Sequence, residues 1–345
     1  MRSIRRALGA AALALAALFV TACQAAPPTP TETHTYSVWD WNVAGSALHH
    51  GRTDTGLIDE VIASITARQP DFMSFNEICQ GQYEAIRDRL AASGHWARAD
   101  DHARFAVTRG AGTGICQGKS FGNALISSHD LGESTEYPLP PDFTQADKAK
   151  AEASGRGVEN RKMLCAPLKD QPRMKFCTLH ITGTNRSLPD PGKGGAPRKV
   201  NGQQLHEVGR ILDSFAAAKE AYLVAGDFNA QPDLKKYVRL APLMAKHTEL
   251  DGDDAEHCPG YGEWTALPPR EVSGSPACGP HAKIDLILAR GKLAKGTYAA
   301  DAWNIPSDCK AVTPDHQLHE PVIRVNCSDH RVITGRATIQ VPTGG

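Results

Sequence analysis

Hydrophobic residues recur along the chain with two periods, and their alternation predicts strands separated by helices. Residues 57–68 carry apolar side chains at helical spacing, and so do residues 202–219. Residues 37–43 alternate between apolar and polar side chains, as expected for a strand with one buried face. Runs that are mostly apolar predict further strands at 71–78, 122–127, 222–225, 284–289 and 331–341.

Two apolar runs, 161–168 and 174–181, are separated by a polar turn and therefore predict a β-hairpin. Cys165 and Cys177 are expected to face each other across it. The preceding segment 131–160 is polar and contains a Lys/Ala/Glu-rich stretch compatible with a helix, but no role is assigned to it. Strands outnumber helices, which is typical of an α/β fold with helix-covered sheets.

The N-terminus has the pattern of an export signal. Three arginines precede the uncharged apolar run 7–20, which is too short to remain as a bilayer-spanning helix. The run leads into Val-Thr-Ala-Cys, which resembles the lipobox of bacterial lipoproteins, so residues 1–22 are expected to be removed and Cys23 to carry lipid. The alternative is an ordinary signal peptide cleaved near Ala22 or Ala26.

The segment after the signal is rich in Pro, Thr and Ala, so residues 23–35 predict a tether. Residues 36–345 predict one globular domain, which we expect to be monomeric and held by lipid on the outer face of a bacterial membrane, or secreted. The signal holds three arginines and no acid, so its removal lowers the formal net charge from zero to about −3. Bulk charge thus gives no indication of nucleic-acid binding, which would need a local basic surface.

Eight cysteines remain when Cys23 is set aside, and an even number in an exported chain indicates disulfides. None has the C-x-x-C spacing of a zinc site. Many connectivities are possible. Order along the chain suggests that neighbours pair, as Cys79–Cys116, Cys165–Cys177, Cys258–Cys278 and Cys309–Cys327.

Polar residues of a few kinds recur where the predicted strands begin or end, which are rigid places from which side chains can converge. Carboxylates suit Mg²⁺, Mn²⁺ or Ca²⁺, and two histidines can exchange protons near neutral pH. Each residue alone is more often a turn, a cap, a surface charge or a structural histidine than a catalytic group. Taken together, the set favours cleavage of a phosphate ester. Its members are Asn42, Glu77, His180, Asp227, Asn229, Asp285, Asp329 and His330.

The order and spacing of this set resemble the endonuclease/exonuclease/phosphatase superfamily. The matching segments span nearly the whole mature chain: WDWNVAG, PDFMSFNEIC, FGNALIS, CTLHITG, LVAGDFNAQPD, KIDLIL and CSDHRVITG. The resemblance implies a four-layer α/β/β/α sandwich of two mixed sheets flanked by helices. It also implies a divalent cation, with Mg²⁺ expected first and Mn²⁺ or Ca²⁺ as alternatives.

The resemblance further implies roles for individual residues. Glu77 would bind the metal with Asn42 and Asp329 close by, and Arg161 would bind phosphate. The attacking water and the phosphate would be held by Asp227 and Asn229. The acid–base pair would be His180 and His330, the latter oriented by Asp285. Which histidine is the base stays open.

Three functions remain as hypotheses. An extracytoplasmic nuclease is favoured by the loop after His180, which carries Arg186, Lys193, Arg198 and Lys199. A phospholipid or sphingomyelin phosphodiesterase, or an inositol phosphatase, would use the same scaffold, but no apolar hairpin for membrane entry is evident. A non-catalytic binding module would need a broken set of site residues, and this set is intact.

Overall fold

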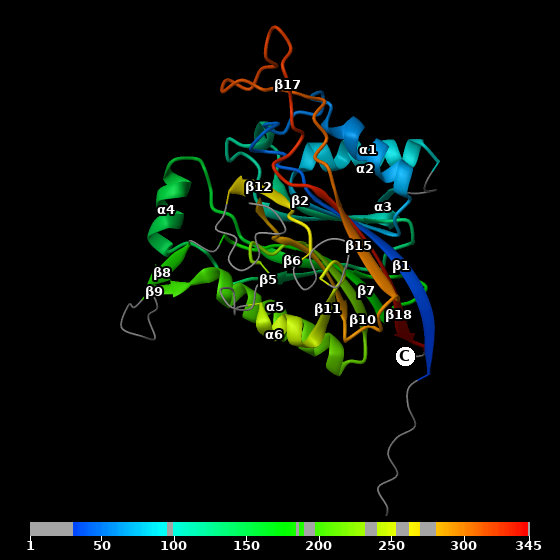
Figure 1. Cartoon of the computed structure of the whole chain (residues 1–345). Coiled ribbons are helices and arrows are strands. Elements are labelled where there is room, and N and C mark those ends of the chain that lie inside the picture. The colour runs from blue at the N-terminus through cyan, green and yellow to red at the C-terminus, as the bar shows by residue number, and fades with distance from the viewer. Residues whose placement is uncertain are drawn as a thin grey trace, which may run out of the picture.

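Two six-stranded sheets pack face to face in the computed structural model, and helices lie outside both (Figure 1). The structure describes residues 30–94, 99–183, 186–189, 197–231, 240–252, 262–269 and 281–343. The predicted four-layer α/β/β/α sandwich of mixed sheets is confirmed. No helix within these ranges is both long and apolar enough to cross a bilayer.

The first sheet contains both ends of the described chain. Only β1 and β2 run parallel among its neighbouring strands. Across the sheet the order is β15 (Tyr298–Trp303), β18 (Val332–Pro342), β1 (Thr31–Asn42), β2 (Phe72–Cys79), β4 (Phe121–Ser127) and β3 (Ala103–Arg109).

The second sheet repeats this arrangement with β10 and β7 as its parallel pair. Its order is β11 (His247–Glu249), β14 (Asp285–Arg290), β10 (Ala221–Asp227), β7 (Met174–His180), β6 (Lys162–Pro167) and β5 (Thr135–Pro138). Each sheet therefore has one parallel pair near its middle, and the carboxyl ends of each pair lie at one edge.

Short ribbons and helices complete the fold. The two-stranded sheets are β8 (Ser187–Pro189) with β9 (Pro197–Lys199), β12 (Ala266–Pro269) with β13 (His281–Ala282), and β16 (Cys309–Lys310) with β17 (Arg324–Val325). The helices are α1 (Leu57–Arg68), α2 (Gln80–Ala92), α3 (Ala99–His102), the 3₁₀ turn Cys116–Gly118, α4 (Gln145–Ala153), α5 (Val200–Ala217) and α6 (Ala241–Lys246).

Strand β1 shows how the sequence pattern produces these layers. Its side chains alternate, so Tyr36 and Val38 join the core between the sheets, whereas Trp39 and Trp41 join a second core beneath α1 and α2. Phe72 of β2 stacks on a ring of the other sheet, Phe176 of β7, with centroids 4.6 Å apart. The apolar stripe of α5 forms a third core on the far side of the second sheet.

The predicted hairpin is confirmed, with Cys165 opposite Cys177 in the β6–β7 register. The predicted tether was too long, because β1 begins at Thr31 and residues 31–35 pair with β18 along a polar but regular ladder. The rest of the expected signal and tether, including Cys23, lies outside the described residues. The segment 131–160 contributes the edge strand β5 and the helix α4.

Three of the four predicted disulfides are present: Cys79–Cys116, Cys165–Cys177 and Cys309–Cys327. The fourth pair, Cys258–Cys278, lies outside the described residues. Cys79 is two residues from Glu77, and Cys327 is two residues from Asp329. Two of the cross-links therefore fix the chain directly beside predicted site residues.

Candidate active site

The two parallel strand pairs bring the predicted residues together. In register, Asp227 of β10 lies between His180 of β7 and Asp285 of β14. Asn42 ends β1 in the facing sheet, and its amide nitrogen lies 3.2 Å from Oδ2 of Asp227. Residues that are far apart in sequence thus meet at one edge of the sandwich, as the strand-end argument predicted.

Glu77 reaches the same place because β2 is irregular there. The register with β4 shifts between Phe75 and Ile78, which adds one residue to β2, and Glu77 has a positive φ of 54°. A bulge of this kind changes the direction of a side chain at the end of a strand. Oε1 of Glu77 accepts a hydrogen bond from Nδ2 of Asn42 at 3.2 Å.

The Gly-Asp-Phe-Asn segment forms a tight turn after β10. Gly226 has a φ of 146°, and a Cβ there would lie 2.1 Å from the carbonyl oxygen of Leu179, so no larger residue fits. Asn229 has a φ of 45° and donates its backbone N–H to Asp227 at 2.7 Å. Its side-chain amide donates to Asp227 at 3.0 Å and to the Ile181 carbonyl at 2.9 Å.

His330 is held by a carboxylate and a threonine. Its Nδ1 lies 2.8 Å from Oδ2 of Asp285, and the same oxygen accepts a hydrogen bond from Thr265 Oγ1 at 2.6 Å. Burial by itself would lower the pKa of His330, but the charges of Asp285 and Asp227 and the hydrogen bond to Asp285 raise it to about 10. The raised pKa favours the protonated ring, and Nδ1–H can donate to Asp285 in either protonation state.

His180 has the opposite preference. Burial, together with the charges of Arg161 and His330, lowers its pKa well below the ordinary value. Its Nε2 lies 3.4 Å from Oδ2 of Asp227 and 3.8 Å from Oε1 of Glu77. Its Nδ1 is buried and has no hydrogen-bond partner among the described residues, so no carboxylate in those ranges orients this ring through Nδ1.

The carboxylates offer a hard cation several oxygens. Burial raises the pKa of Glu77, and burial with the charge of Asp285 raises that of Asp227 to about 7, so both would gain from a bound cation. Asp227, Asp285 and His330 each offer one ligand atom within 4.8 Å of the others. Glu77 lies outside this group of three, in which Nδ1 of His330 and Asp285 already bond each other.

Two of the residues expected beside the metal differ in their arrangement. Oδ1 of Asn42 accepts from the backbone N–H of Ala44 at 3.1 Å, so Asn42 turns its NH₂ group toward the carboxylates and acts as a donor. Asp329 is half-exposed, and its Oδ1 lies 4.0 Å from Nε2 of His330. Asp329 therefore lies on the open side of the site.

Arg161, expected to bind phosphate, is engaged by the 131–160 segment. Its guanidinium lies 3.2 Å from Glu159 and 3.7 Å from Asp142, and it donates to the His180 carbonyl at 3.2 Å. Asp142 also accepts from Thr182 Oγ1 at 2.9 Å. The segment without an assigned role thus supplies two carboxylates that hold Arg161 beside the end of β7.

Sequence reasoning missed a polar layer beneath the site. Oδ1 of Asn76 accepts the backbone N–H of Asp227 at 2.8 Å, and its Nδ2 donates to Thr178 at 3.2 Å. Ser74 bonds Thr178 at 2.7 Å and completes this link between the sheets. Strict alternation in β2, which turns Ser74 and Asn76 to the same face, is the signal that could have revealed it.

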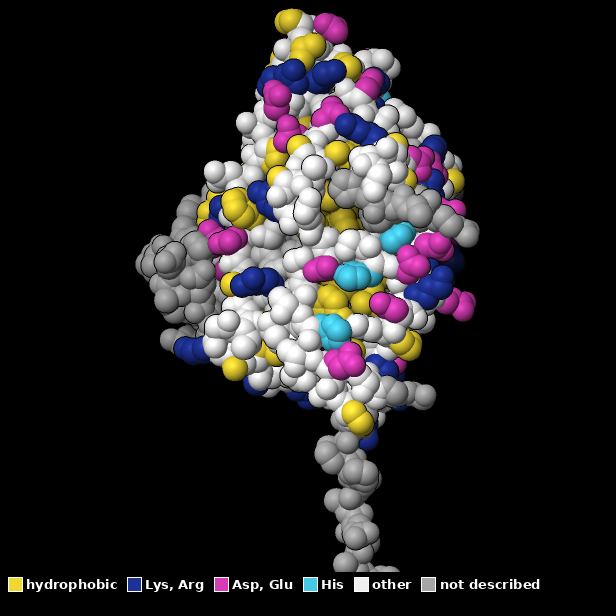
Figure 2. Space-filling view, turned by 90° about the vertical axis from the view of Figure 1, so that its right-hand side faces the viewer, with side chains coloured by type: hydrophobic (Ala, Val, Ile, Leu, Met, Phe, Trp, Pro, Cys, Tyr) yellow, Lys and Arg dark blue, Asp and Glu magenta, His cyan; other side chains and the backbone are white. Residues whose placement is uncertain are grey.

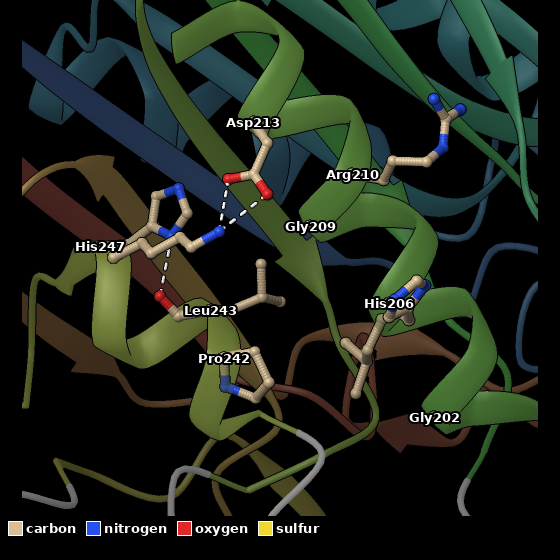
Figure 3. Close-up of a pocket in the computed structure, with 10 residues that line it drawn as sticks. Gly202, His206, Gly209, Arg210, Asp213, Pro242, Leu243 and His247 are labelled. Carbon is tan, nitrogen blue, oxygen red and sulfur yellow. Dashed lines mark hydrogen bonds and ion pairs between the residues drawn. The ribbon is translucent and has the colours of Figure 1, made fainter. Parts of the chain in front are cut away.

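A groove of about 380 Å³ lies between α5 and α6, outside the second sheet (Figure 3). None of the predicted site residues lines it. An ion pair between Lys246 and Asp213 spans one end of it. The groove is therefore separate from the cluster of candidate site residues.

Comparisons with known proteins agree with this geometry. A sequence model described as the Endonuclease/Exonuclease/phosphatase family matches residues 41–330. Among curated protein sequences, none matches the chain.

Solved structures share the fold at low identity. The human Nocturnin catalytic domain with bound sulfate anion is 16% identical, with a TM-score of 0.52, and the match covers 90% of this chain and 98% of that one. D. rerio TDP2 complexed with single strand DNA product is 14% identical, with a TM-score of 0.51, and the match covers 88% of this chain and 98% of that one. The mannosyl-6-phosphatase Bt3783 of Bacteroides thetaiotaomicron VPI-5482 is 12% identical, with a TM-score of 0.52, and the match covers 89% of this chain and 99% of that one.

Proposed function

The chain belongs to the endonuclease/exonuclease/phosphatase family, and on that premise we propose that it is an exported, divalent-metal-dependent nuclease. Membership makes it a hydrolase of phosphoester bonds in a family whose enzymes use divalent metals. The finer proposal is that its substrate is the phosphodiester backbone of nucleic acid. Export and a lipid anchor on Cys23 are part of the proposal, supported by the signal-like N-terminus and the three disulfides.

One observation carries the proposed chemistry. Two histidines with opposite proton preferences flank a cluster of Asn42, Glu77 and Asp227. His330 holds a proton that it can give to the leaving oxygen, whereas His180 is neutral. Acid and base groups whose pKa values are driven apart are what an ester-cleaving site needs near neutral pH.

The remaining side chains position the reactants. Asp227, whose pKa is raised to about 7, lies where it can accept a proton from the attacking water and share it with His180 Nε2. The amide groups of Asn42 and Asn229 can donate to phosphate oxygens. A divalent cation bound at Glu77 would supply Lewis-acid stabilisation of the charge on the phosphate. Phosphorus–oxygen cleavage then leaves one product with a phosphate and the other with a hydroxyl group.

Nucleic acid is favoured by the surroundings of His180. Arg198 and Lys199 end β9 directly before α5, and Asn201 in the first turn of that helix donates to the Thr182 carbonyl at 2.8 Å, so this stretch of the chain lies close to the end of β7. A structural relative has been solved with single strand DNA product. Backbone phosphates are bound by cations in such positions.

A second candidate, a phospholipid phosphodiesterase, is favoured by one surface feature that was not evident from the sequence. The segment between β15 and β18 projects from the top of the molecule beside β17 (Figure 1), with hydrophobic side chains at its end (Figure 2). Val322 and Ile323 are adjacent and 47% and 44% exposed. The Cys309–Cys327 disulfide closes the base of this segment three residues before His330.

One panel on the purified mature domain separates the two. Plasmid, single-stranded DNA, RNA, sphingomyelin vesicles and an inositol polyphosphate are each incubated with Mg²⁺ and with EDTA, with Glu77→Gln as the inactive control. We expect Mg²⁺-dependent cleavage of at least one nucleic acid. Cleavage of sphingomyelin alone would favour the second candidate, and cleavage of the inositol polyphosphate alone would contradict both.

A further inference from the structure

An indole and two arginines form a surface on the outer face of the first sheet that the catalytic site does not use. A hollow of about 310 Å³ lies beside the end of α1, and its lining includes Arg68, Trp303, Thr334 and Arg336. The Cζ atom of Arg68 lies 4.2 Å from the centroid of the Trp303 ring. The indole nitrogen donates to Thr334 Oγ1 at 2.8 Å, so the ring is held in place from two sides.

The surface keeps groups that a ligand can contact, although Nη1 of Arg68 already donates to the carbonyl and hydroxyl oxygens of Ser64 at 3.3 and 3.1 Å. Trp303 is 42% exposed, which is unusual for an indole. In the described part of the chain, neither Arg68 nor Arg336 lies within ion-pair distance of a carboxylate, and Nε of Arg68 is buried without a hydrogen-bond partner. In contrast, Arg52, Arg89 and Arg210 are paired at 2.5, 2.5 and 2.6 Å.

This surface is connected to the acid–base centre through one residue. Arg331 follows His330 directly, and its Nε donates to the Trp303 carbonyl at 3.0 Å. The guanidinium of Arg331 lies 4.6 Å from the ring centroid of Trp264, whose neighbour Thr265 bonds Asp285. In the β15–β18 register Trp303 is opposite Val332, two residues after His330.

We infer that the surface of Arg68, Trp303, Thr334 and Arg336 binds a single-stranded segment of the nucleic-acid substrate. This inference rests on the proposed nuclease function. An unpaired base can stack on an exposed indole or on a guanidinium plane, and a base inside a duplex cannot. The guanidinium of Arg336 then neutralises a neighbouring phosphate. Such a surface binds without strong sequence preference, because every base has an aromatic face.

Asp301 is the feature that opposes phosphate binding. It is exposed, lines the same hollow, and is two residues from Trp303 on β15. Its charge would repel a phosphate that approaches Arg336. The inference therefore predicts that Asp301→Asn tightens binding, whereas a purely structural role of the surface predicts no change.

The test measures binding and cleavage of a fluorescent single-stranded 16-mer, with the duplex of the same sequence as comparison. Binding is measured in the Glu77→Gln background, so that the oligonucleotide stays intact. Trp303→Leu should weaken single-strand binding about tenfold, and Trp303→Phe should retain most of it. Arg336→Ala should weaken it and lower the salt dependence by about one phosphate contact. Arg210→Ala, a surface arginine on α5, is the matched control.

A small chromogenic phosphodiester and vesicles separate the outcomes. When Glu77 is left unchanged, so that the enzyme is active, the Trp303→Leu and Arg336→Ala variants should hydrolyse the small diester at the wild-type rate. Unchanged oligonucleotide binding in both variants, while wild type still cuts DNA or RNA, overturns the surface and leaves the nuclease function. The inference is also overturned if the two variants lose binding to vesicles but keep binding to the oligonucleotide. It is overturned too if the wild-type enzyme hydrolyses the small diester but cleaves no nucleic acid.

Discussion

The side-chain amide of Asn42 lies 3.2 Å from Asp227, and this contact joins the two sheets at the edge where the candidate site residues meet. The same amide nitrogen lies 3.2 Å from Glu77. One donor thus holds two carboxylates that would otherwise repel each other. The arrangement lets Asn42 support the fold and, in the proposed mechanism, donate to the phosphate.

Asn42→Ala is expected to lower kcat/KM on a small phosphodiester by about 100-fold or more, because a preorganised donor is lost beside the phosphate. Stability should fall by about 1–3 kcal/mol, since buried carboxylate oxygens lose their partner. Steady-state kinetics and thermal unfolding measure the two effects. Asn304→Ala, at an exposed asparagine, is the control, and an active Asn42→Ala enzyme would contradict the assignment.

Glu77→Gln keeps the shape of the side chain but removes the charge that holds the cation. Turnover should fall by orders of magnitude, and the Mg²⁺ concentration for half-activity should rise. Glu84→Gln, on the surface of α2, is the matched control. A variant that keeps more than about a tenth of wild-type turnover at saturating Mg²⁺, equivalent to about 1.4 kcal/mol of barrier, would show that Glu77 is not the principal ligand.

Asp285→Asn should change the pH dependence as well as the rate. The charges of Asp285, Asp227 and Asp329 and the hydrogen bond to Asp285 together raise the pKa of His330 to about 10, so activity that needs protonated His330 is present below that pH and lost above it. Removing the negative charge favours the neutral ring, so the alkaline limb of kcat/KM should move down by about 1–3 pH units. Asp213→Asn is the surface control. An alkaline limb that stays in place would assign it to another group.

The four basic residues between His180 and α5 are expected to contribute unequally to nucleic-acid binding. Nη2 of Arg186 lies 3.2 Å from Asp147, and its Nε donates to the Asp142 carbonyl, so Arg186 is already engaged. Arg198→Ala with Lys199→Ala should therefore account for most of the loss of nucleic-acid binding and flatten its salt dependence, whereas Arg186→Ala should do little. Lys193 lies outside the described residues. Equal effects of Arg186→Ala and the double variant would contradict this division.

The sequence predicted the elements whose side-chain pattern is strong. Helix α1 has the predicted bounds, and β7 and β10 place His180 and Asp227 as expected. Strand β15 was missed because its Tyr-Ala-Ala-Asp-Ala-Trp sequence is rich in alanine, which has low strand propensity, and lies at a sheet edge. Without β15, the contacts of Trp303 with Arg68 and Thr334 could not be predicted.

The parts of the site that could not be predicted depend on long-range contacts. Glu159 and Asp142 hold Arg161 only because the 131–160 segment folds back over the hairpin, and no periodicity in that segment reports this. The bulge that turns Glu77 into the site is a property of the β2–β4 register, which appears only when both strands are paired. The exposed pair Val322–Ile323 is short and differs from a core segment only in its surroundings.

The positions of Cys79 and Cys327 have a consequence for where the protein can act. Each is cross-linked two residues from a site residue, Glu77 in one case and Asp329 in the other. Reducing conditions such as those of the bacterial cytosol would leave both segments without their covalent anchors. Under the proposed function, an exported nuclease whose site is anchored only after oxidation would spare the nucleic acids of the cell that makes it until export is complete.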